Sequence, residues 1–180
     1  MPERWLLVGV VLPLWWIAGG ADWWLHRRSG IEDAGDPRES LLHLLMLAEV
    51  GVPTLALLVF EVDAWLLLLC VVGFLAHELT VYVDLQHAEA RRAITSLEQV
   101  VHSFQELLPL AACLLLFAAH WSQALALLGL GDEAARWRPR VKAQPWPDGT
   151  AVGVLAGSAA VVVLYIEELW RCRGRRRAAP

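Results

Sequence analysis

Five stretches of this chain are long and apolar enough to cross a lipid bilayer as helices. A bilayer core of about 30 Å requires roughly 20 helical residues. Hydrophobic side chains make up 57% of the sequence, above the roughly 45–50% of ordinary soluble domains. We therefore predict an all-α, polytopic membrane bundle with a single domain over residues 1–180 and five transmembrane helices at 4–25, 41–62, 64–86, 100–128 and 149–170.

The basic residues are divided unequally between the two sides of such a bundle. Ten of the 15 Lys and Arg residues fall on the side that holds the C-terminus, and five fall on the other side. Because basic loops remain in the cytoplasm, we expect a multi-pass protein of a bacterial-type inner (plasma) membrane with its N-terminus outside and its C-terminus cytoplasmic. The net charge of −4 and the lack of a basic face argue against nucleic acid as a partner.

Histidines and carboxylates recur in one order at the predicted inner ends of four helices. Each of two hairpins has an acid–histidine pair on either side of a short basic loop, in the order Asp22-x3-His26, Glu39-x3-His43, Asp84-x2-His87 and Glu98-x3-His102. Residues three or four apart share one helix face. Each second helix then carries a deeper glutamate and a proline. This repetition predicts a duplicated helical hairpin whose copies are related by an axis along the membrane normal.

Eight such side chains at one end of a bundle would form a donor set for two transition metals. Ionisable residues inside membrane spans are costly, so each one is a candidate functional residue. Soluble di-iron bundles combine carboxylates with Glu-x2-His pairs on facing helices. Imidazole and carboxylate without thiolate favour iron, manganese or zinc. The predicted metal ligands, with iron the favoured metal and His77 an additional ligand about 10 Å deeper, are Asp22, His26, Glu39, His43, His77, Asp84, His87, Glu98 and His102.

Helix capping is an alternative explanation for the two glutamates. Asp36-Pro37-Arg38-Glu39 and Thr95-Ser96-Leu97-Glu98 both have the form of a capping box. Capping explains either glutamate taken singly, but it requires no histidine one turn later. At the opposite interface His120, Glu61 and Asp63 are expected to be ordinary interface residues. Glu167 and Glu168, at the inner end of the fifth helix, are expected to be solvated, and a supporting role beside the metal ligands is the alternative.

In ligand type and helical placement, residues 22–106 resemble the membrane-bound non-haem di-metal proteins. These include the alkane hydroxylases, the fatty-acid desaturases and hydroxylases, and the alternative oxidases. The chain lacks the HxxxH and HxxHH boxes of the first two groups, and its x2 spacing, Asp84-x2-His87, has Asp where alternative oxidases have Glu. The resemblance implies oxygen-dependent redox chemistry at a di-iron centre with a lipid-soluble substrate.

The favoured function is therefore a membrane di-iron oxidoreductase. It would act on a membrane lipid or another lipid-soluble substrate, with electrons from a redox partner, and Glu49, Glu78 and Glu106 would act as catalytic proton-relay groups. A zinc-dependent intramembrane hydrolase is one alternative. A b-type haem electron-transfer protein, with His43 and His102 as axial ligands, is another. Metal-ion transport ranks last, because the fourth span is apolar beyond the cluster.

Overall fold

The computed structural model describes residues 2–34 and 37–178, and its architecture is all-α. Five helices are long and apolar enough to cross a membrane, as expected of a multi-pass membrane protein. Near the N-terminus, α1, a π-helical turn at Leu7–Val11 and α2 run on as one span. The helices in chain order are α1 (Pro2–Leu6), α2 (Leu12–Ser29), α3 (Arg38–Val59), α4 (Ala64–Glu89), α5 (Ser96–Ala119), α6 (Trp121–Leu127) and α7 (Thr150–Ala178).

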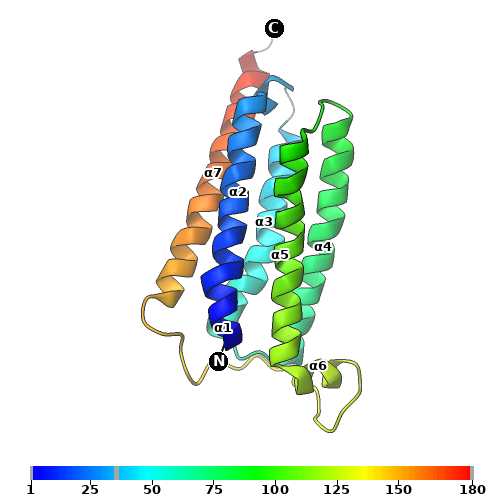
Figure 1. Ribbon diagram of the computed structural model, residues 1–180, viewed down its shortest axis with the longest axis vertical. Helices are drawn as coiled ribbons and strands as arrows, with labels where there is room; N and C mark the ends of the chain where they lie inside the picture. Colours follow the sequence, from blue (N-terminus) through cyan, green and yellow to red (C-terminus); the bar gives the residue numbers. More distant parts are fainter. Residues whose placement is uncertain (1, 35–36, 179–180) are drawn as a thin grey trace.

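The five long helices pack side by side as a closed bundle (Figure 1). Going round it, α2 packs against α5, α5 against α4, α4 against α3, and α7 closes the ring between α3 and α2. This order places α2 opposite α4 and α3 opposite α5, which is the order that a duplicated hairpin requires. The duplication itself stays a prediction. The end with the turn at 90–95 and the C-terminus of α7 is called the turn end, and the end with α6 is called the loop end.

The distribution of side chains on α4 is inverted relative to that of a soluble protein. Its outward stripe is apolar, and Val72, Leu75 and Leu79 are 54%, 59% and 65% exposed. Its inward face is apolar near the loop end but carries His77, Thr80 and Asp84 toward the turn end, all buried. An exposed apolar stripe of this length fits a lipid-facing surface. Helix α4 therefore directs its buried polar residues inward and gathers them toward the turn end.

At the loop end, two of the helices end earlier than the predicted spans. The predicted span 100–128 is interrupted at His120, where α5 ends and the short helix α6 begins. The Gln123 side chain accepts hydrogen bonds from the backbone N–H groups of Ala64 and Arg136, so α6 is held against the start of α4. The predicted span 41–62 ends earlier, at Val59, because the following residues pair with the backbone of the segment around Val141.

A proline and a glycine bring α3 and α4 into close contact. Pro53 lacks an N–H group, so the carbonyl of Glu49 has no helical partner. Gly73 of α4 faces that carbonyl, and a Cβ atom at Gly73 would lie only 2.6 Å from the Glu49 oxygen. A close Cα–H to carbonyl contact of this kind is common between packed helices. The absence of a side chain at position 73 thus sets the spacing of the two helices.

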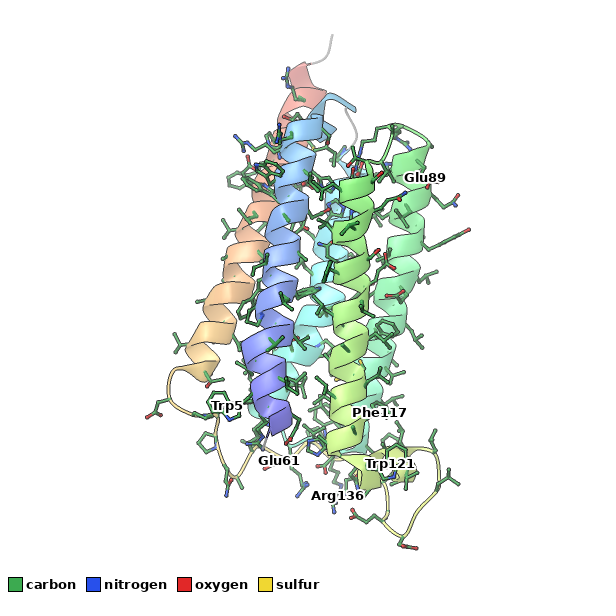
Figure 2. The ribbon with its side chains drawn as sticks, viewed as in Figure 1. Trp5, Glu61, Glu89, Phe117, Trp121 and Arg136 are labelled. Atoms are coloured by element: carbon green, nitrogen blue, oxygen red, sulfur yellow. The ribbon has the colours of Figure 1, made fainter. Side chains whose placement is uncertain are left out.

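Asp63 holds the loop end together. Its side chain is only 1% exposed, and its carboxylate accepts hydrogen bonds from Arg140 at 2.8 and 2.9 Å and from Arg136 at 3.3 Å. The long connection before α7 is thereby tied to the turn between α3 and α4, and Glu61 and Arg136 lie together at this end of the bundle (Figure 2). The expectation that Asp63 is an ordinary interface residue was wrong, because it is a buried anchor.

We expect Gly73→Ala to destabilise the bundle by about 1–3 kcal/mol, because the added methyl group would clash with the Glu49 carbonyl. Gly51→Ala is the matched control, since a Cβ atom there meets nothing within 4 Å. Thermal unfolding in detergent measures both. Equal melting temperatures for the two variants would contradict this close contact.

Asp63 should make the stability of the protein depend on pH. Burial alone would raise the pKa of Asp63, but hydrogen bonds and charge from Arg140 and Arg136 hold it below its usual value. A carboxylate with a lowered pKa stabilises the folded state above its unfolded pKa of about 3.9, and this contribution is lost as the pH falls further. We expect Asp63→Asn to lower the melting temperature by a few degrees at pH 5–8 and by less below pH 4.

The exposed Asp132 is the control position for this experiment. Asp132→Asn should leave the melting temperature unchanged at each pH. A difference between wild type and Asp63→Asn that persisted undiminished at low pH would exclude the carboxylate charge as its cause.

Candidate metal centre

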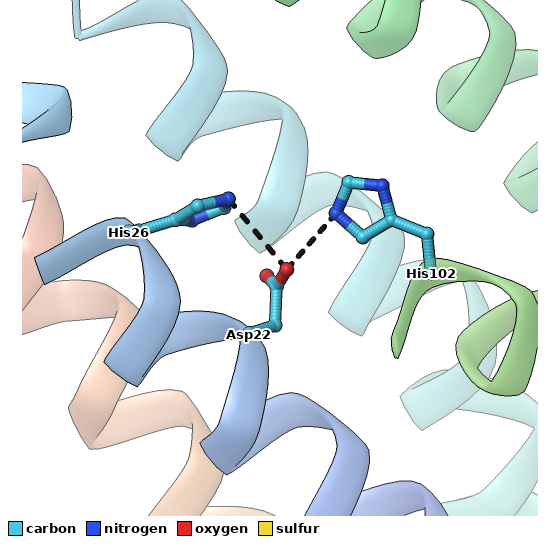
Figure 3. A group of neighbouring side chains, drawn as sticks. All are labelled: Asp22, His26 and His102. Carbon is cyan, nitrogen blue, oxygen red and sulfur yellow. Dashed lines mark hydrogen bonds and ion pairs between the residues drawn. The ribbon is translucent and has the colours of Figure 1, made fainter. Parts of the chain in front are cut away.

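Asp22 lies between two histidines that come from different helices. It is buried near the end of α2, and one of its carboxylate oxygens lies 2.9 Å from Nε2 of His102 on α5 and 3.6 Å from Nε2 of His26. Figure 3 shows both rings directed at this oxygen. His26 follows Asp22 by one turn, and α2 ends soon afterwards at Gly30, whose φ of 70° favours glycine. The predicted Asp22-x3-His26 pair therefore does converge on one point.

Glu168 of α7 joins His26 to a third histidine. One oxygen of its carboxylate lies 3.1 Å from Nδ1 of His26, and the other lies 3.0 Å from Nδ1 of His43 on α3. The two imidazole rings are stacked with their centroids 4.8 Å apart. On its other side, His43 presents Nε2 to Asp84 of α4 at 3.4 Å. This chain of contacts links α2, α3, α4 and α7.

Arg92 brings together the two glutamates that begin α3 and α5. Its guanidinium group lies 2.5 Å from Glu39 and 2.5 Å from Glu98, in the turn between α4 and α5. Burial opposes the charge, but hydrogen bonds to Glu98 and Glu39 raise the pKa of Arg92 above its usual value. Arg92 therefore stays positively charged, and it holds α3 and α5 together through their first turns.

The capping hypothesis is correct for Glu98, which also contacts the cluster. Thr95 and Glu98 form a reciprocal capping box at the start of α5. One Glu98 oxygen nevertheless lies 3.3 Å from Nε2 of His26. In the other predicted box, Asp36 lies outside the described residues, and Glu39 faces Arg92. Capping and a place in the cluster are thus compatible for the same glutamate.

Tyr165 fixes the second oxygen of Asp22. Its hydroxyl group donates to that oxygen at 2.8 Å and accepts a hydrogen bond from the Gln105 side chain at 3.2 Å. The Tyr165 ring also packs edge-on against His43, with their centroids 5.3 Å apart. Because Tyr165 and Glu168 are three residues apart, α7 presents both to the same side of the bundle. Helix α7 therefore contributes two side chains, Tyr165 and Glu168, to the cluster.

Seven of the nine predicted ligands lie in this network of contacts, and two lie elsewhere. His87 is half-buried at the end of α4 and belongs to none of the His and carboxylate groups whose atoms could share a metal ion. His77 is buried about two helical turns deeper and lines a cavity below the cluster. The network members are Asp22, His26, Glu39, His43, Asp84, Glu98 and His102.

The three glutamates predicted as proton-relay groups lie deeper in the bundle. Among the described residues, they belong to no group of His and carboxylate side chains that could share a metal ion. Glu49 accepts a hydrogen bond of 2.8 Å from Thr80 across the interface of α3 and α4. Glu106 lines the cavity below the cluster. Glu78 is half-buried on α4 and lies within electrostatic reach of Glu106. Their catalytic role stays a prediction.

Sequence reasoning missed three members of the cluster, and for Glu168 the expectation was wrong. Glu168 is fully buried, whereas its neighbour Glu167 is part-exposed and bonds Trp23, Arg27 and Arg171. A signal was present in the sequence: Tyr165 and Glu168 are the polar residues of one face of an otherwise apolar helix. Nothing in the sequence marked Arg92 as a residue of the cluster, because arginines are common in loops.

The cluster contains three groups of side chains that could each hold a metal ion. In each group the potential ligand atoms lie within 4.8 Å of one another, and His26 belongs to all three. The groups are Asp22 with His26 and His102; His26 with His43 and Glu168; and His26 with Glu39 and Glu98. All five carboxylates of the cluster are buried, and Arg92 supplies one positive charge. With neutral imidazoles, four net negative charges remain.

We expect Arg92→Gln to lower the melting temperature of metal-depleted protein by several degrees, because Glu39 and Glu98 would then repel each other without a counter-charge. Arg91→Gln is the control, since Arg91 is exposed and its side chain bonds the backbone of His87. Thermal unfolding in the presence of a chelator measures both. Equal decreases in melting temperature for Arg92→Gln and Arg91→Gln would show that Arg92 is an ordinary loop residue.

Comparison with known proteins adds no relative from which a role could be transferred. No family model, curated protein or solved structure matches the chain. A proposal for the function of the cluster therefore rests on the donor atoms, burial and charge of the cluster itself.

Proposed function

We propose that this protein is an integral membrane metalloenzyme that holds two transition-metal ions, with iron favoured, in the cluster at the turn end. The observation that carries the proposal is the buried excess of negative charge beside three imidazoles. Uncompensated charge inside an apolar bundle is strongly unfavourable. Two divalent cations would neutralise the four net negative charges of the cluster. Protons on the imidazoles would offset part of that charge before metal binds.

The ligand groups suggest how the two ions would be shared. Asp22, His26 and His102 would hold one ion. His43 would hold the second, with Asp84 beside it. Glu168 directs one oxygen toward Nδ1 of His26 and the other toward Nδ1 of His43, so it would orient both rings so that their Nε2 atoms could hold the ions. Glu98 also approaches Nε2 of His26, but Arg92 competes with any metal for the oxygens of Glu98 and Glu39.

The surroundings of the cluster favour redox chemistry on a lipid-soluble substrate. A di-iron centre with nitrogen and oxygen ligands supplies dioxygen-dependent oxidation, with electrons from a redox partner. Tyr165 orients Asp22 through its hydroxyl group and can hold a proton beside it. The adjoining cavity is walled largely by apolar side chains, and Glu106 is available there to relay protons. The basic residues at the turn end favour placing this end, and the C-terminus, in the cytoplasm.

A zinc-dependent intramembrane hydrolase is the second candidate. Asp22, His26 and His102 together form a two-histidine, one-carboxylate set, which is typical of catalytic zinc with one open position. The two functions differ in metal identity. Iron would give a near-ultraviolet or visible absorption band that responds to dioxygen, whereas zinc would give none.

The neighbouring residues Glu167 and Glu168 provide a matched test. We expect Glu168→Gln to lose at least half of the metal bound after anaerobic loading with Fe(II), because the buried carboxylate between His26 and His43 is removed. Glu167→Gln should keep the wild-type content, since the partners of Glu167 among the described residues, Trp23, Arg27 and Arg171, lie outside the cluster. Elemental analysis and absorption spectra of detergent-purified protein measure this. Unchanged metal content in Glu168→Gln would exclude the proposed role of Glu168 in holding the two histidines for metal binding.

A further inference from the structure

A central cavity lies directly below the cluster. It encloses about 530 Å³ of space free of protein atoms, counting its open mouth, and residues from α2, α3, α4, α5 and α7 line it. Its walls include Trp15, Leu47, Val81, Leu85 and Val161. The cavity touches the cluster at Asp22, His43, Asp84 and His102.

His77 is the feature of this cavity that the proposed metal centre does not use. Its side chain is only 2% exposed, and neither ring nitrogen forms a hydrogen bond with the described residues. Leaving buried polar groups without partners costs about 1–3 kcal/mol, so an unpartnered imidazole in a cavity suggests a missing ligand group. His77 precedes Asp84 by seven residues of α4, or about 10 Å of helix. A ligand that contacts His77 can therefore extend toward the cluster.

The chemistry around His77 indicates which group is missing. A neutral imidazole has one N–H donor and one acceptor nitrogen. The ring lies beside the backbones of Gln105 and Met46, both of which can only accept a hydrogen bond from it, and the Gln105 carbonyl has no helical partner because Pro109 lacks an N–H group. That carbonyl can face the donor side of the ring. The acceptor nitrogen is then the unmet group, and it requires a donor such as a hydroxyl.

We propose that the cavity binds a neutral, lipid-soluble molecule bearing a hydroxyl group that donates a hydrogen bond to His77. The apolar walls accommodate the rest of the molecule, and the nearby carboxylates Asp84 and Glu106 exclude an anion. His77 is thus a substrate-binding residue. The proposal deepens the proposed function by naming the chemical class of its substrate, and it rests on that function only in calling the bound molecule a substrate.

The test compares 2-naphthol with 2-methylnaphthalene, which have the same ring system but differ in the hydroxyl group. Saturable binding of each radiolabelled probe is measured with the full chain in nanodiscs, and empty nanodiscs are subtracted. Wild type should prefer 2-naphthol by about 3- to 10-fold. His77→Phe should lose this preference, and His77→Gln, which keeps an acceptor, should retain part of it. Leu79→Phe is the control, since Leu79 faces outward on the same helix and is 65% exposed.

Metal content measured on the same samples separates this proposal from the metal proposal. His77→Phe should keep the wild-type metal content, and a loss of metal would make His77 a ligand and overturn the assignment. Absence of saturable binding, or an unchanged preference in His77→Phe, would also overturn it. If protein that binds no metal still shows a His77-dependent preference for 2-naphthol, the ligand site is supported and the proposed metalloenzyme function is excluded.

Discussion

The burial of five carboxylates at one end of an apolar bundle is the constraint on which the rest of this structure depends. In a soluble protein water would solvate these groups, but in a five-helix bundle with an apolar outer surface they must find partners inside. Three imidazoles, one guanidinium and one phenol meet them in a connected network. The network still carries an excess of negative charge. A cation is the simplest group that would balance it.

The order of the helices around the bundle brings the side chains of this network together. Helix α7 lies between α2 and α3, and from there Glu168 reaches a histidine on each of them. On the opposite side of the ring, α4 and α5 supply Asp84 and His102. The Pro53 and Gly73 contact holds α3 close to α4, and Asp63 ties the connection before α7 to the other end. The contacts at the loop end thus tie the connections to the bundle, while the turn end holds the candidate metal ligands.

Much of the fold could be predicted because membrane spans are set by length and hydropathy alone. The five spans follow from these two properties, and helical periodicity predicted that Asp22 and His26 would meet on one face of α2. The break at His120 could not be predicted, because it depends on a contact between Gln123 and the start of α4. Glu168 was misjudged because it sits beside arginines and a tryptophan, a setting typical of a solvated helix end. Its burial depends on which face of α7 meets the bundle, and packing alone decides that.

His77 illustrates the difference between sharing a helix face and sharing a site. Its spacing from Asp84 correctly predicted a common face, but the rise of the helix places it below the metal groups, in the cavity wall. One face of α4 therefore carries both Asp84, in the proposed metal cluster, and His77, in the proposed ligand site below it.

The metal content of the wild-type protein purified from its membrane, without added metal, tests the central claim most directly. We expect elemental analysis to find close to two transition-metal ions per chain, with iron as the main element. Zinc at the same ratio would keep the metal centre but favour hydrolysis. Protein that is folded, contains less than a tenth of an ion per chain and takes up none from solution would contradict the account.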